Sequence, residues 1–161
     1  MAVTVGVVGS AIVMVSVLFV LGLFGVRKYL SGAKSSEVKN SLGQLAKDAA
    51  AAHDRDGSLC ASASRPVPVD VSAIRGRKYQ SHAAEWEVDR PRHAGFACLD
   101  FSMNTPQRYQ YRYEATATSF LAGGRGDLDG DGDLSNFTLT GEVLDGRLVL
   151  SPSIEESDPE E

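Results

Sequence analysis

Four aspartates alternate with other residues in a glycine-rich stretch of this sequence. The pattern gives carboxylates at positions 1, 3 and 5 of a calcium loop, glycine at position 6 and a backbone carbonyl at position 7. Position 12 holds Thr138 in place of the usual bidentate Glu, and Glu142 or Asp145 are the alternatives. We predict a structural calcium ion held by Asp127, Asp129, Asp131, Asp133 and Ser135.

The competing interpretation of this stretch is an exposed, metal-free turn between two strands. The integrin-type tripeptide Arg125-Gly126-Asp127 is explained by the same turn chemistry. The histidines show no Ser/His/Asp or Cys/His arrangement, and no phosphate loop or paired-carboxylate site is present. We therefore expect neither an enzyme nor a small-molecule substrate.

The two cysteines, Cys60 and Cys98, match no zinc motif. A disulfide is the simplest use for them if the domain lies outside the cytoplasm, and two buried free thiols are the alternative.

Short segments of β type must position the aspartate loop. We expect a hairpin of 95–103 with 107–113, further strands over 116–121, 135–143 and 147–150, and an Asp145-Gly146 turn. Tyr109, Tyr111 and Tyr113 share one face, which favours core packing over a binding surface.

A helical stripe precedes these strands, formed by Val38, Leu42, Leu45, Ala49 and Ala52. The helix is expected to end near Asp54–Gly57 and to begin near residue 3, which gives a length of roughly 75 Å. The predicted fold is α+β, with one long N-terminal helix packed on a small antiparallel sheet.

Residues 1–26 carry no charge and are long enough to cross the roughly 30 Å hydrocarbon layer. We interpret them as a transmembrane anchor; a cleaved signal and a buried core helix are the alternatives. Residues 27–56 form the helical stem, 57–152 the β-sheet head and 153–161 a loose acidic tail. The anchor residues are Val3, Val7, Ile12, Val15, Leu18, Leu21 and Phe24.

The net charge of −5 over 161 residues gives no support for nucleic-acid binding. Basic residues just after the anchor would suit anionic head groups, and naive counting would place that flank in the cytoplasm.

Several segments together resemble type IV pilins and type II secretion pseudopilins. They are residues 26–42, Lys78-Tyr79-Gln80, 98–103, 106–111, 126–132 and 148–151. The resemblance implies a domain facing the periplasm in spite of the basic flank. The sequence lacks the Gly and the Glu of the prepilin peptidase motif, which favours a permanently anchored fimbrial-like protein over a major pilin.

The resemblance thus implies a single-pass protein of the bacterial inner membrane with a periplasmic or cell-surface C-terminal domain. Its role would be structural, in a type IV pilus or a type II secretion-like system, as a homo-oligomer or with pilus or secretion components. The alternative function is a periplasmic, calcium-stabilised binding module that stays outside any filament.

Overall fold

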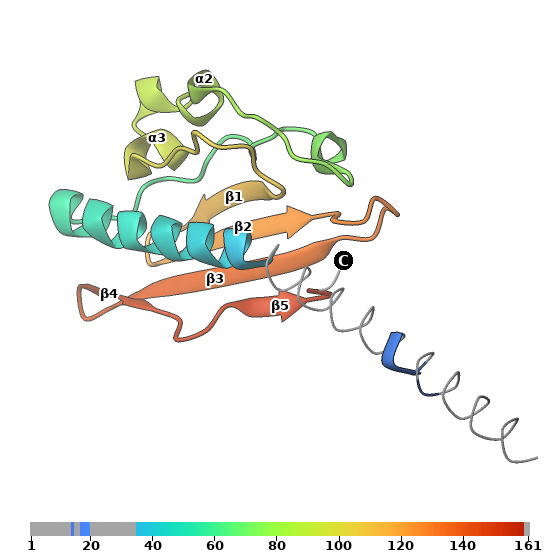
Figure 1. Cartoon of the computed structure of the whole chain (residues 1–161). Helices are drawn as coiled ribbons and strands as arrows, with labels where there is room; N and C mark the ends of the chain where they lie inside the picture. Colours follow the sequence, from blue (N-terminus) through green and yellow to red (C-terminus); the bar gives the residue numbers. More distant parts are fainter. Residues whose placement is uncertain (1–13, 15–16, 20–34, 160–161) are drawn as a thin grey trace, which may run out of the picture.

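The computed structural model of the chain describes residue 14, residues 17–19 and residues 35–159 (Figure 1). Residues 35–56 are helical, and four short helical elements follow them. These are η1 (Val71–Ile74), α2 (Ala83–Trp86), η2 (Arg90–Arg92) and α3 (Gly95–Leu99).

The second half of the chain forms a five-stranded antiparallel sheet. Its strands are β1 (Gln110–Ala115), β2 (Ser119–Gly126), β3 (Ser135–Leu144), β4 (Arg147–Leu150) and β5 (Glu155–Ser157). The order is β1-β2-β3-β4, and β5 pairs with the other half of β3. The strand β3 therefore pairs with three others, and the aspartate loop connects it to β2.

The predicted turn between β3 and β4 is confirmed. Asp145 and Gly146 have φ of 52° and 76°, as a two-residue type I′ hairpin requires. Strand β4 covers the predicted residues 147–150, and β3 extends the predicted 135–143 by one residue. The turn signal Asp145-Gly146 between two short apolar runs was sufficient to predict this hairpin.

The helix of residues 35–56 lies along one face of the sheet (Figure 1). Its predicted stripe is buried, with Val38, Leu42 and Leu45 at 0% exposure and Ala49 and Ala52 at 1%. The helix ends as expected, because Gly57 has φ of 71° and its amide donates to the carbonyl of His53.

The three tyrosines of the predicted stripe are core residues. Tyr109 and Tyr111 are 0% exposed and Tyr113 is 1% exposed. The Trp86 ring meets Phe96 and Phe101 edge to face, with centroids 5.0 and 5.4 Å away. The rings of Trp86 and Phe101 each lie 6.4 Å from that of Tyr111 in β1, so aromatic packing joins α2 and α3 to the sheet.

Residues 63–67 cover the outer edge of β1. The amide of Ala63 donates to the carbonyl of Tyr113, and Val67 exchanges two backbone hydrogen bonds with Tyr111. The fully buried Gln107 side chain donates to the carbonyl of Val67 and so holds this segment in register. The free backbone groups of an edge strand are thereby paired.

The prediction of a strand over 95–103 is wrong, and with it the hairpin to 107–113. Residues Gly95–Leu99 form the helix α3, and β1 pairs with β2 instead. A short run of alternating apolar residues is compatible with either element. Here Phe96 and Leu99 are three positions apart and both buried, which suits one face of a helix.

The predicted long-helix fold is also wrong. Within the described residues, no helix is long and apolar enough to cross a membrane. The helix that packs on the sheet, residues 35–56, is amphipathic and carries exposed charges such as Lys47, Asp54 and Arg55. Its polar face excludes it from a hydrocarbon layer.

The same finding on the described helices contradicts the predicted location, a single pass through the bacterial inner membrane. Among the predicted anchor residues, Leu18 is described and is 63% exposed. The others, Val3, Val7, Ile12, Val15, Leu21 and Phe24, lie outside the described residues.

The tail, expected to be loose, contains the strand β5. Glu156 in β5 forms a 2.8 Å ion pair with Lys39 of the helix, and the Lys39 ammonium lies 5.8 Å from the centroid of the Phe137 ring. These contacts tie the acidic segment to both the helix and β3.

Candidate functional site: the aspartate loop

The aspartate loop, residues 127–134, connects β2 to β3. The strand β2 is paired with β3 along its whole length, and Gly126 opposite Ser135 is the last pair before the loop. Ser135 is fully buried, and its hydroxyl donates to the carbonyl of Gly126 at 3.0 Å. The ends of the loop are therefore fixed by the sheet.

Asp127 is the buried anchor of the loop. Its side chain is 4% exposed, and its two carboxylate oxygens accept the amides of Gly130 at 2.6 Å and Gly132 at 3.1 Å. Both glycines have positive φ, 90° and 109°, which lets the backbone bend around the carboxylate. Because Asp127 is buried, the Arg125-Gly126-Asp127 tripeptide does not present its acid to a partner.

Asp129 and Asp131 are exposed and each bonds the amide two residues on. The amide of Asp131 donates to Asp129 at 3.2 Å, and that of Asp133 donates to Asp131 at 2.8 Å. These Asx turns fold the loop so that its carboxylates lie on one side. Carboxylate oxygens of Asp127, Asp129 and Asp131 lie within 4.8 Å of one another.

This spacing fits a calcium ion. Oxygen ligands lie 2.3–2.6 Å from calcium, so ligands on opposite sides of the ion are about 4.8 Å apart. Three hard carboxylate oxygens are the donor set that calcium prefers, and the remaining positions of a six- to eight-oxygen shell would fall to backbone carbonyls and water.

The structure brings together three of the five predicted ligands. Asp133 is exposed and contributes its amide to Asp131. Ser135 directs its hydroxyl to the Gly126 carbonyl on the sheet side. The position-12 alternatives lie far along β3, since at about 3.3 Å per residue Glu142 is more than 20 Å beyond Ser135 and Asp145 farther still.

Arg75 is a member of this site that sequence reasoning missed. It follows η1, and its Nε donates to the carbonyl of Gly130 at 3.1 Å while Nη2 donates to that of Asp131 at 3.0 Å. The same Nε lies 3.5 Å from a carboxylate oxygen of Asp127. A separation of 55 residues along the chain left no local signal of this contact.

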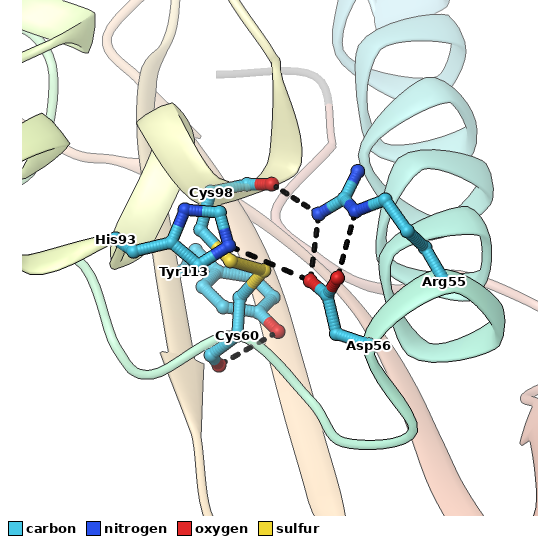
Figure 2. The surroundings of a disulfide bond; sticks show 6 residues. All are labelled: Arg55, Asp56, Cys60, His93, Cys98 and Tyr113. Carbon is cyan, nitrogen blue, oxygen red and sulfur yellow. Dashed lines mark hydrogen bonds and ion pairs between the residues drawn. A yellow bond between two sulfur atoms is a disulfide. The ribbon is translucent and has the colours of Figure 1, made fainter.

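A second group of candidate ligands is excluded by the disulfide. Asp56, His93 and Cys98 converge, but the Cys98 sulfur is bonded to Cys60 with an S–S distance of 2.03 Å (Figure 2). The predicted disulfide is therefore confirmed. Because its sulfur is bonded to Cys60, Cys98 has no thiolate to offer a metal.

The carboxylate next to the disulfide has an ionic role instead. Asp56 accepts two hydrogen bonds from Arg55 and lies 3.5 Å from Nε2 of His93 (Figure 2). The Arg55 guanidinium lowers the pKa of Asp56 and also donates to the carbonyl of Cys98 at 3.2 Å. These contacts join the end of the 35–56 helix to α3.

Comparisons of this chain with protein-family models, with curated proteins and with solved structures give no match. The case for a function therefore rests on the geometry of the aspartate loop and the disulfide.

Proposed function

We propose that this chain is a non-catalytic binding module whose sheet is stabilised by a calcium ion in the aspartate loop. The observation that carries the proposal is the convergence of the Asp127, Asp129 and Asp131 carboxylates within 4.8 Å. A divalent cation offsets the repulsion between three such groups, which otherwise opposes the folded loop.

The metal in this proposal is structural. The loop begins where the Gly126–Ser135 pair ends, so ordering it would constrain the end of the two central strands β2 and β3. Calcium would constrain the loop between β2 and β3, and the Cys60–Cys98 disulfide constrains a separate part of the chain. A buried disulfide is typical of proteins outside the reducing cytosol, where millimolar calcium is also available.

The assembly role in a pilus or a type II secretion-like system stays a prediction that rests on the segment resemblance. The binding module is the better-supported alternative, because it needs the loop and the sheet but no membrane helix. A homo-oligomer or a protein partner is compatible with it.

The test is the thermal unfolding of the full chain in calcium and in chelator. Calcium at about 100 times its dissociation constant should add roughly 2.7 kcal/mol to the free energy of unfolding. The double variant Asp129→Asn/Asp131→Asn should lose most of that gain. Each Asn keeps the side-chain oxygen that accepts the loop amide but loses the charge, so the loop fold is preserved.

The matched control is Glu142→Gln/Asp145→Asn, which also removes two negative charges but does so far from the loop. Asp145 has φ of 52°, a conformation that Asn tolerates well. This control should keep the full response to calcium. Equal melting temperatures of the native chain in calcium and in chelator would show that the loop is an ordinary, metal-free turn.

A further inference from the structure

The segment just after η1 is bound to the aspartate loop at several points. The amide of Gly76 donates to the carbonyl of Asp127 at 2.9 Å, and the Arg75 guanidinium donates to two loop carbonyls. Gly76 has φ of 60°, and a Cβ added there would lie 3.4 Å from the Cα of Gly130. The two backbones therefore run in direct contact.

The charge of Arg75 meets the most buried carboxylate of the loop. The Asp127 side chain is 4% exposed, whereas that of Arg75 is 54% exposed. A buried carboxylate is costly unless it is hydrogen-bonded and faces a counter-charge. Two loop amides satisfy the first condition and the guanidinium satisfies the second.

We propose that Arg75 is the intramolecular counter-cation of the aspartate loop. It orders the loop without a metal, and it opposes the entry of a divalent cation into the same cluster of carboxylates. The first statement stands by itself, and the second rests on the calcium site proposed above.

Two effects make Arg75 a competitor. Its hydrogen bonds to the carbonyls of Gly130 and Asp131 hold the backbone that carries the loop carboxylates in its metal-free arrangement. Its positive charge also repels a divalent ion. At a separation of about 6 Å with water-like screening, this repulsion corresponds to roughly a tenfold loss of affinity. Because the guanidinium is half exposed, the effect should shrink as salt rises.

The first experiment measures hydrogen exchange of the full chain in chelator. In Arg75→Gln the amides of Gly130 and Gly132 should exchange faster than in the native chain, because the loop loses its counter-charge and its two donors. The control Arg147→Gln removes an exposed arginine from the far β3–β4 hairpin and should leave this exchange unchanged. Unchanged exchange in Arg75→Gln would overturn the proposal that Arg75 is the counter-cation of the loop.

The second experiment measures calcium affinity by calorimetry at low salt, with calcium ions alone as the probe. Arg75→Gln should bind calcium about tenfold more tightly than the native chain, and Arg147→Gln should match the native chain. Arg75→Lys keeps the charge but not the forked donor geometry, so its affinity should stay near native while its loop exchanges faster.

The outcomes separate this inference from the calcium site itself. Equal or weaker calcium binding by Arg75→Gln, with clear binding by the native chain, overturns the competition. If neither protein binds calcium while Arg75→Gln alone exchanges faster, Arg75 remains the counter-cation and the calcium site is rejected.

Discussion

The contact between Gly124 and Val38 decides whether the 35–56 helix can lie on the sheet. A Cβ added at Gly124 would lie 2.3 Å from Cγ2 of Val38, far inside van der Waals contact. Val38 is fully buried, and Gly124 lies in the central strand β2 between Tyr111 and Phe137. Because strands hold β2 on both sides, the backbone at Gly124 has little room to move away.

The variant Gly124→Ala should therefore be overpacked. Inserting a methyl group into a packed core costs about 1–3 kcal/mol. For a domain of this size 1 kcal/mol shifts the melting temperature by about 4 °C, so the expected loss is roughly 4–12 °C. The assay is thermal and denaturant unfolding of the full chain, followed by circular dichroism.

Gly43→Ala is the matched control, because it makes the same substitution on the helix where nothing beyond the adjacent residues and the helix's own backbone lies within 4 Å of the new Cβ. It should stabilise the chain by up to about 1 kcal/mol, since Ala is the better helix former. The double variant Val38→Ala/Gly124→Ala removes the clash. Its loss in free energy of unfolding should be smaller than the summed losses of the two single variants, by about 1 kcal/mol or more. Additive losses, or a Gly124→Ala protein as stable as the native one, would refute this packing of the helix on β2.

Three further predictions concern the disulfide and the buried titratable groups. Cys60→Ala/Cys98→Ala opens a loop with a sequence separation of 38, which should lower the free energy of unfolding by about 4 kcal/mol in denaturant titrations. Burial raises the pKa of Tyr109 and of Tyr113 to about 12, so their stabilisation is complete below the ordinary value of 10.0 and is lost as pH rises through 12. Tyrosinate absorbance should accordingly rise with unfolding; free titration of all five tyrosines near pH 10.0 in the folded protein would contradict it. Burial of Asp89 opposes ionisation, but hydrogen bonds from the Ser64 amide and from Arg92 prevail and lower its pKa. Its stabilisation is therefore present above pH 3.8 and lost as pH falls through the depressed value, and Asp89→Asn should weaken the acid dependence of unfolding.

Local pattern alone determined several parts of this protein. The spacing of Val38, Leu42 and Leu45 defined the buried face of a helix, and Asp145-Gly146 between two apolar runs defined a hairpin. The alternating aspartates defined a loop with converging carboxylates, because the geometry of such a loop depends on neighbours in the sequence. With two cysteines and no zinc motif, the sequence favoured a Cys60–Cys98 disulfide over two free thiols, and the structure confirms the bond.

The tertiary structure decided which element each ambiguous segment becomes and which distant groups meet. Residues 95–99 are short and apolar enough for either a strand or a helix, and packing of Phe96 against Trp86 accompanies the helix α3. Periodicity specifies the face that an element buries but not the partner that covers it. Arg75 shows the limit most clearly: it donates hydrogen bonds to loop carbonyls 55 and 56 positions away, and hydrogen bonds of that range form only when the chain has folded.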